Sequence, residues 1–277
     1  RGEALAELGV LQHQILTDKK VGEWLRNALQ EELNDAEQAN LREMTRQYEQ
    51  AALLPESLVE AKSLAGSRCE HAWRSQRPAN DWQGFAENLR EVVKLSREEA
   101  QIRAAAKGCS RYDALLDIFE PDMTSTRLDV LFADLKSWLP TLLEKVVEKQ
   151  AQTPLIEPQG PFPIADQREL GLEAMRVLGF DFDGGRLDIS AHPFCGGVPQ
   201  DVRITTRYNE NDLLSALFGV IHETGHARYE QNLPRNWIDQ PIALARSTAI
   251  HESQSLFFEM QLGRSEAFLQ RLLPTVR

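Results

Sequence analysis

The residues whose types and spacing could do chemistry are His222, Glu223 and His226, in the segment 220–227. They form an H-E-x-x-H pattern inside an apolar-periodic stretch that predicts a helix, so positions 222 and 226 lie one turn apart on one face. Two imidazoles placed in this way can bind one metal ion, and Glu223 can reach a water molecule on that ion. The pattern therefore predicts a zinc hydrolase rather than a solvated turn of helix.

A catalytic zinc site usually has three protein ligands and one open position, so a third ligand is needed. Glu252 is the candidate, because it lies in a second apolar-periodic segment, 242–262, that predicts a neighbouring antiparallel helix. Glu259 is the alternative, although its aromatic neighbours indicate a packing environment. A third histidine is excluded for the longer H-E-x-x-H-x-x-G-x-x-H pattern, since Tyr229 and Asn232 occupy its last two defined positions.

The predicted chemistry follows from these groups. A zinc ion lowers the pKa of a bound water towards about 7 and polarises a carbonyl, while Glu223 accepts and returns the proton. Co²⁺ or Mn²⁺ could occupy the same nitrogen and oxygen ligands. We expect His251 to support Glu252, and His192 either to contact substrate or to be a hydrogen-bonded structural residue. Arg203 is interpreted as a strand residue that faces solvent or pairs with an acid.

Helices are expected to dominate the chain and to position these groups. The first of them, 21–33, has apolar residues at spacings of three and four that we expect to form core. A helix starting near Thr124 is expected to kink or restart at Pro140, and Asn80 and Gly108 are the expected ends of an earlier one. The other predicted helices cover 35–54, 55–77, 80–106, 111–119, 167–178, 211–234 and 242–262.

Alternation of apolar and polar residues predicts two strands, around 187–189 and 202–208, that pair as a small antiparallel β-sheet beside the motif helix. The stretch 192–197 is expected to be the short connection between them. Four prolines in the segment 153–163 mark a loop between an N-terminal helical region, 1–152, and a zinc-binding catalytic region, 153–277, of one continuous domain. The predicted fold class is mainly α, a multi-helix zincin-like metallopeptidase.

Composition indicates which binding partners and which cellular compartment to expect. A net charge of -11 disfavours nucleic acid as a partner, and no apolar run is long enough to span a bilayer. Cys69, Cys109 and Cys195 form neither a C-x-x-C pair nor an even set, which indicates inert reduced thiols and a cytoplasmic location. The chain starts without a signal peptide pattern, so secretion is not expected.

The chain resembles the carboxypeptidase Taq family of thermostable metallocarboxypeptidases. The resemblance is carried by the segments 222–227, 229–231, 250–255 and 201–208, together with His192-Pro193-Phe194 and Leu262-Gly263-Arg264-Ser265. It implies metal-dependent release of single residues from the free C termini of peptides by a mostly helical protein with a deep cleft. It also implies that His222, His226 and Glu252 are the metal ligands and that Glu223 is the catalytic glutamate.

The resemblance further implies a homodimer when the protein is complete, and a chain that here lacks both ends of the family's length. The family's arginine for the substrate carboxylate is then expected after Arg277. Two alternatives stay open beside the carboxypeptidase. One is an oligopeptidase or endopeptidase of similar fold, and the other is an inactive metal-binding fragment whose apolar surfaces are exposed because the C-terminal part is missing.

Overall fold

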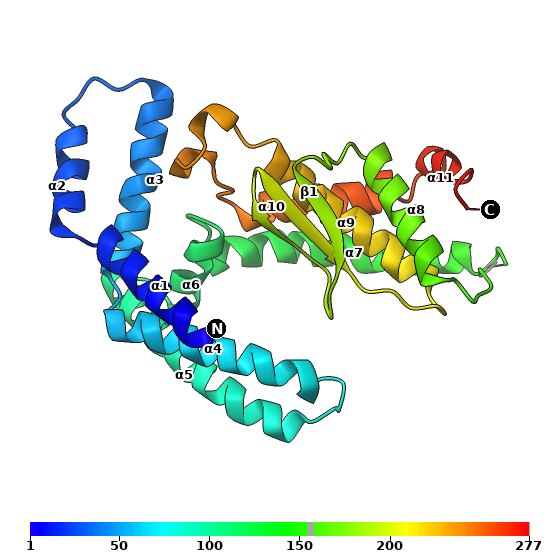
Figure 1. Ribbon diagram of the computed structural model, residues 1–277, viewed down its shortest axis with the longest axis horizontal. Helices are drawn as coiled ribbons and strands as arrows, with labels where there is room; N and C mark the ends of the chain where they lie inside the picture. Colours follow the sequence, from blue (N-terminus) through cyan, green and yellow to red (C-terminus); the bar gives the residue numbers. More distant parts are fainter. Residues whose placement is uncertain (155–157, 277) are drawn as a thin grey trace. The chain divides into compact units, whose positions relative to one another are not determined.

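The computed structural model describes residues 1–154 and 158–276, and Figure 1 shows that these residues form helices and one small sheet. They fall into two compact units. The first comprises Arg1–Ser125 with Trp237–Leu244, and the second comprises Thr126–Asn236 with Ala245–Arg277. The expectation of a mainly helical fold is confirmed, while the regional boundary at residue 152 stays a prediction. None of the helices in the described ranges is both long and apolar enough to cross a membrane.

Four helices of the first unit begin at a residue whose side chain caps them. Asn34 and Glu37 form a capping box at one helix, Ser110 accepts a hydrogen bond from the Asp113 amide at another, and Gly108 ends a helix with a φ of 67°. Asp81, rather than the predicted Asn80, caps the helix at 82. The helices are α1 (Gly2–Leu16), α2 (Lys19–Ala28), α3 (Asp35–Ala52), α4 (Glu56–Gln76), α5 (Trp82–Lys107) and α6 (Arg111–Phe119).

The helix expected over 21–33 is shorter than predicted. It ends at Ala28, because the next helix starts from the capping box at Asn34, whose extended backbone interrupts any continuous helix. Trp24 and Leu29, which the spacing placed in a core, are both exposed, and only Gly22 and Leu25 are buried. The prediction of a core stripe was therefore wrong for most of this segment.

Asp117, near the end of α6, binds cations from two other helices of the first unit. Its carboxylate accepts hydrogen bonds from Arg46 at 3.0 Å, from the Asp122 amide at 3.0 Å and from Lys107. Burial raises the pKa of the Asp117 carboxyl, but the donors Lys107, Asp122 and Arg46 outweigh burial and hold the pKa well below its usual range. The side chain is only 13% exposed, so water screens these contacts weakly.

The second unit contains the longest exposed helix and the sheet. Helix α7 (Ser125–Gln150) runs without interruption through Pro140, so the predicted kink or restart is absent from it. The expected loop at 153–163 is confirmed outside 155–157, which lie beyond the described residues. The other helices of this unit are α8 (Ile164–Val177), α9 (Leu213–Gln231), α10 (Thr248–Leu256), the π-helical η3 (Phe257–Leu262) and α11 (Glu266–Leu272). A short 3-10 turn, η1 (Arg235–Trp237), lies at the boundary of the two units, and a second, η2 (Pro241–Ala243), belongs to the first unit.

The sheet is mixed, not antiparallel as expected. β1 (Gly185–Ile189) pairs in parallel with β3 (Asp201–Thr206), and β2 (Phe194–Val198) pairs antiparallel with the other edge of β3. The stretch predicted as a connection therefore holds a strand of its own, which carries the chain back so that β3 can run parallel to β1. Gly197 makes the hairpin between β2 and β3 feasible, because its φ is 112° and a Cβ would lie 2.1 Å from the Asp201 carbonyl oxygen.

Helix α9 is the centre of the second unit. On one side Val220 and Ala227 join a core with the sheet residues Leu187, Val202 and Ile204. On another side the same helix packs against α8 and α11 through a second core, which consists of Leu170, Ala174, Leu217, Ile221, Phe268 and Leu272. A helix buried on several sides is held rigidly, so side chains on its remaining face keep a fixed direction.

Helices α9 and α10 cross at Gly225. A Cβ on Gly225 would lie 2.6 Å from the Ser255 Cα and 3.0 Å from the Gln254 carbonyl oxygen, so only glycine permits this approach. The Gln254 amide donates a hydrogen bond of 3.0 Å to the Gly225 carbonyl oxygen at the same point. The crossing fixes α10 against the face of α9 that carries the H-E-x-x-H motif.

We predict that Gly225→Ala destabilises the second unit by about 1 to 3 kcal/mol, the usual cost of forcing extra volume into a packed contact. Chemical denaturation followed by circular dichroism measures the change. The matched control is Gly66→Ala on α4, where nothing lies within 4 Å of the new Cβ. Alanine favours a helix over glycine by roughly 0.5 to 1 kcal/mol, so the control should be neutral or stabilising. Equal effects of the two variants would contradict the tight crossing.

We predict that Asp117→Asn lowers the free energy of unfolding at pH 7 by roughly 1 to 3 kcal/mol, because Arg46 and Lys107 lose the anion that they share. The pKa of Asp117 is depressed in the folded state, so its stabilisation is present above the unfolded pKa of about 4 and is lost as the pH falls further. The gap between wild type and variant should therefore shrink below about pH 4. Denaturation at a series of pH values tests this, with the exposed Glu31→Gln as control. A gap that is constant down to pH 2 would refute it.

Candidate metal centre

His222 and His226 project from one face of α9, as their spacing predicts. Asp212 starts this helix by accepting a hydrogen bond of 3.0 Å from the Ser215 amide, which agrees with the expected start. The two ring centroids are 5.0 Å apart and the rings are nearly perpendicular, at 78°. Both side chains are half-buried at the crossing with α10.

Glu252, on α10, lies against both imidazoles. Its Oε2 is 3.2 Å from Nε2 of His226 and 3.8 Å from Nε2 of His222. Ser255, which is fully buried, has its hydroxyl 2.7 Å from the Glu252 carbonyl oxygen and 3.1 Å from Oε2. The carboxylate is therefore held toward the two rings by a neighbour one turn along the same helix.

These three residues meet the requirements of a divalent cation. Their ligand atoms lie within 4.8 Å of one another, and they are the one such group found among the described His, Cys, Asp and Glu residues. Ligands about 2.0 to 2.1 Å from a tetrahedral zinc would be separated by roughly 3.3 Å, so small side-chain movements complete the set. Two imidazoles and one carboxylate also leave the fourth position open.

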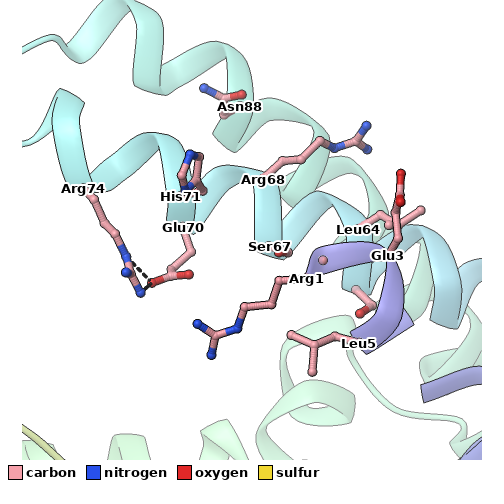
Figure 2. Close-up of a pocket in the computed structure, with 13 residues that line it drawn as sticks. Arg1, Glu3, Leu5, Leu64, Ser67, Arg68, Glu70, His71, Arg74 and Asn88 are labelled. Carbon is pink, nitrogen blue, oxygen red and sulfur yellow. Dashed lines mark hydrogen bonds and ion pairs between the residues drawn. The ribbon is translucent and has the colours of Figure 1, made fainter. Parts of the chain in front are cut away.

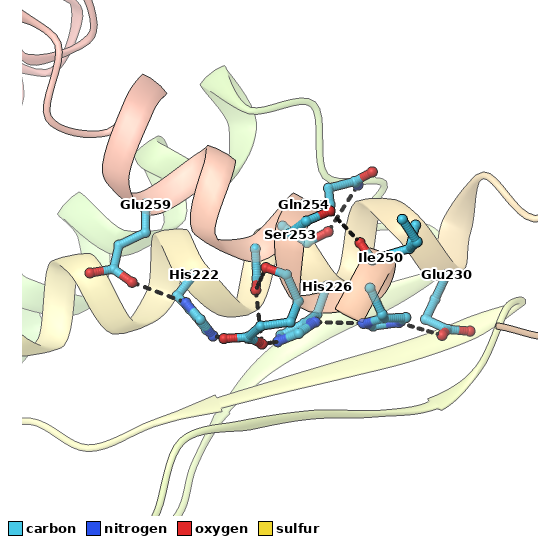
Figure 3. A network of polar contacts seen from close by, with 11 residues as sticks. His222, His226, Glu230, Ile250, Ser253, Gln254 and Glu259 are labelled. Carbon is cyan, nitrogen blue, oxygen red and sulfur yellow. Dashed lines mark hydrogen bonds and ion pairs between the residues drawn. The ribbon is translucent and has the colours of Figure 1, made fainter. Parts of the chain in front are cut away.

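Glu259, the alternative ligand, does not join this group. Its Oε2 lies 3.0 Å from Nδ1 of His222, the ring nitrogen that faces away from Glu252 (Figure 3). The other oxygen of Glu259 accepts a hydrogen bond of 3.0 Å from Arg264. The cause is the π-helical turn η3, which replaces the regular helix expected up to residue 262.

His226 is a neutral base at physiological pH. Burial lowers the pKa of His226 to about 4, and the nearby imidazoles of His251 and His222 lower it in the same direction. Its contact with Glu252 is therefore not an ion pair in the neutral range. A neutral imidazole has the free lone pair that a metal ion requires.

Glu223 is buried beside the candidate ligands. Burial raises the pKa of Glu223, and the carboxylate of Glu252 raises it further, whereas His222 and His192 lower it. The charge of Glu223 also contributes to the raised pKa of Cys195 on β2. A carboxyl group with a raised pKa in this position is suited to accept and to release a proton.

His192 lies on the exposed connection between β1 and β2. Its Nδ1 is 2.7 Å from the Pro193 carbonyl oxygen, which can only accept, so Nδ1 carries the proton and Nε2 stays open. The charge of His192 is also the smallest of the causes that act on the pKa of Glu223. Its role in binding substrate stays a prediction.

Several neighbours of the site differ from expectation or could not be predicted from sequence. His251 contacts His226 and Glu230, whereas we expected it to support Glu252. The contacts of Glu230 and Ser255 had no distinctive sequence signal, since each depends on how the helices fold. Arg203 forms two hydrogen bonds of 3.1 Å and one of 2.6 Å with Asp201, as the interpretation of a paired strand residue predicts.

The cysteines are free thiols and take no part in the candidate site's charge. Cys69 is buried, Cys109 is exposed and Cys195 is intermediate. Burial raises the pKa of Cys195 to about 12, and the carboxylates of Glu223 and Glu230 add to this. Cys195 is therefore a protonated, inert thiol beside the site, as expected.

Two hollows differ in their relation to the candidate centre. One, of about 320 Å³, adjoins His222 in the second unit and is lined by Ser215, Phe218, Gly219, His222, Glu259 and Arg264. The other, of about 970 Å³, lies in the first unit between α1 and α4, where Arg74 donates to Glu70 at 2.6 and 2.9 Å (Figure 2). None of the predicted site residues lines this second hollow.

Known proteins resemble this chain over its whole length. The family model described as carboxypeptidase Taq (M32) metallopeptidase matches residues 1–277. Thermostable carboxypeptidase 1 of Thermus thermophilus is 39% identical over 292 aligned residues, which cover 100% of this chain and 57% of that protein. Carboxypeptidase 1 of Bacillus subtilis is 35% identical, over 97% of this chain and 54% of that protein.

Solved structures resemble this chain in the same way, over nearly all of this chain and part of their own length. The Trypanosoma cruzi metallocarboxypeptidase 1 superposes with a TM-score of 0.87 and 48% identity, covering 99% of this chain and 56% of that one. The chain thus spans little more than half the length of the relatives it matches. The match nevertheless extends over the whole of this chain, and the chain belongs to the carboxypeptidase Taq (M32) family of metallopeptidases.

Proposed function

We propose that this chain carries the metal centre of a carboxypeptidase that releases single residues from the free C termini of peptides. The observation that carries the proposal is the convergence of His222, His226 and Glu252, from two crossing helices, beside the buried carboxyl group of Glu223. Membership of a metallopeptidase family supports a divalent metal, and the names of the relatives support peptides as the substrates.

In this proposal His222, His226 and Glu252 hold the ion. When bound, zinc lowers the pKa of water and polarises the scissile carbonyl group. Glu223 accepts the proton of the attacking water and later delivers it to the leaving amine, so no covalent intermediate on the protein is needed. His192, with Nε2 open, is proposed to contact the substrate from the β1–β2 connection. Zinc is the proposed ion, with Co²⁺ or Mn²⁺ as alternatives that the same ligands accept.

Helix α7 favours a second candidate, a chain that binds metal without turnover. None of its residues is buried, and ten of its large apolar side chains are exposed. They are Val130, Leu131, Phe132, Leu135, Trp138, Leu139, Leu142, Leu143, Val146 and Val147. An apolar surface of this extent marks a face that another protein surface covers, and a cleft that is incomplete without it would bind the ion and not turn over peptides.

We further propose a homodimer for the complete protein and a reducing, cytoplasmic location, which the three free thiols support. Sedimentation of the protein at several concentrations tests the dimer, and localisation of a tagged protein tests the compartment. A monomer at all concentrations, or recovery in a secreted fraction, would reject the respective proposal.

The activity is tested with paired peptides that differ only in a free or an amidated C terminus. Release of single residues from the free peptide alone supports the carboxypeptidase. Cleavage of both peptides would indicate an endopeptidase, and bound metal without cleavage of either would support the second candidate. Elemental analysis of the purified protein identifies the ion. Removal with a chelator and return of Zn²⁺ should abolish and then restore any turnover.

We predict that Glu223→Gln and Glu252→Ala separate catalysis from metal binding. Glu223→Gln keeps the ligands but loses the base, so turnover should fall by about 10² to 10⁴ while the metal content is unchanged. Glu252→Ala removes a ligand, so the metal content should fall. Turnover by release of C-terminal residues and metal by elemental analysis are measured together. Normal turnover in Glu223→Gln would remove this residue as the base.

A further inference from the structure

We propose that His251 with Glu230, and Glu259 with Arg264, are positioning residues that fix both histidine ligands in the protonation pattern and direction needed for metal binding. The inference rests on the proposed function, because it assigns roles around the same ion. It concerns the nitrogen of each imidazole that does not face Glu252. Figure 3 shows that each of these nitrogens has a partner, and that the contacts form one row along α9.

On the His226 side the row consists of two successive contacts. Nδ1 of His226 lies 2.6 Å from Nδ1 of His251, and Nε2 of His251 lies 2.7 Å from Oε1 of Glu230. The Glu230 carboxylate only accepts, so His251 donates to it from Nε2, and an imidazole that donates from one ring nitrogen offers the other, here Nδ1, as an acceptor. His226 then donates from Nδ1, which leaves the lone pair on its Nε2, the nitrogen 3.2 Å from Glu252.

On the His222 side one carboxylate does the same. Oε2 of Glu259 accepts from Nδ1 of His222 at 3.0 Å, so the lone pair of His222 is on Nε2, toward Glu252. Arg264 donates to Oε1 of Glu259 at 3.0 Å and lies over the Phe218 ring, 4.4 Å from its centroid. The guanidinium group therefore fixes both the charge and the position of the carboxylate.

The two partners reach the imidazoles from the same segment of chain that supplies Glu252. His251 precedes Glu252 on α10, and its ring also packs against Tyr229, with centroids 4.6 Å apart. Glu259 lies in the π-helical turn η3, in which the Gly263 amide donates to the Phe258 carbonyl oxygen at 2.7 Å. Such turns are frequent at functional sites, and this one carries Glu259 to His222.

Partners of this kind orient an imidazole and raise its basicity, and their loss typically weakens metal binding by about 10 to 100-fold. We therefore expect His251→Phe and Glu259→Leu to weaken Zn²⁺ binding by on the order of 10 to 100-fold, although neither removes a ligand. His251→Gln and Glu259→Gln keep a carbonyl oxygen that can accept from the imidazole, so they should recover much of the affinity.

The experiment measures Zn²⁺ affinity of the purified chain by competition with a fluorescent chelator, and the absorption spectrum of the Co²⁺ form. Loss in the Phe and Leu variants, recovery in the Gln variants, and a changed Co²⁺ spectrum support the inference. The matched control is Glu266→Gln on α11, an exposed glutamate that accepts from Gln270 and should behave as wild type. Circular dichroism reports whether each variant folds.

Glu230→Ala provides the test if the Phe or Leu variants do not fold, since Glu230 contacts His251 and not a ligand. It should weaken binding by about 10-fold, the lower end of the same range. If the folded variants keep the wild-type Zn²⁺ affinity and an unchanged Co²⁺ spectrum, this inference is overturned while the proposed metal centre is not. Failure of the wild-type chain to bind either ion would instead overturn the proposed metal centre, and the inference with it.

Discussion

The close approach of α9 and α10 at Gly225 is the constraint on which the candidate centre depends. The H-E-x-x-H spacing brings two imidazoles together on one helix, but the third donor must come from another helix, and its reach is short. With no side chain at position 225, the backbone of α10 lies against α9, and Gln254 ties the two helices through the Gly225 carbonyl oxygen. Glu252 is then 3.2 Å from His226, a distance that a carboxylate on a more distant helix would not reach.

This crossing also concentrates charge that a cation would offset. Glu223, Glu252, Glu230 and Glu259 all lie along one stretch of α9 and its neighbour, and the pKa of Glu223 is raised rather than lowered. Acidic groups gathered in a half-buried place cost stability unless a partner neutralises them. Arg264 neutralises Glu259, whereas Glu252 contacts His222 and the neutral His226. A divalent ion at Glu252 would turn this cost into a favourable interaction, which links metal binding to the stability of the second unit.

Local patterns were enough to predict the parts of the molecule that depend on neighbours in sequence. The i, i+4 spacing of His222 and His226, the cap at Asp212 and the end of a helix at Gly108 are such features. Features that depend on distant segments were missed or wrong. β1 and β3 are parallel because β2, which lies between them in sequence, runs in the opposite direction. Glu259 contacts His222 because a π-helical turn shifts its position. Alternation and helical period do not encode strand order or such a turn.

The candidate centre and the apolar face of α7 differ in how much additional protein structure each requires. The proposed ligands and their partners lie between His222 on α9 and Arg264, inside one compact unit, and they contact one another directly. All the residues proposed to hold the ion therefore belong to that unit. The exposed leucines and valines on α7 are not buried by those contacts. Binding of a substrate in a cleft also requires more surrounding protein surface than two crossing helices provide. In the proposed function, affinity for the ion and turnover of peptides are thus separable, and the ligands and partners proposed to set the affinity all lie within the second unit.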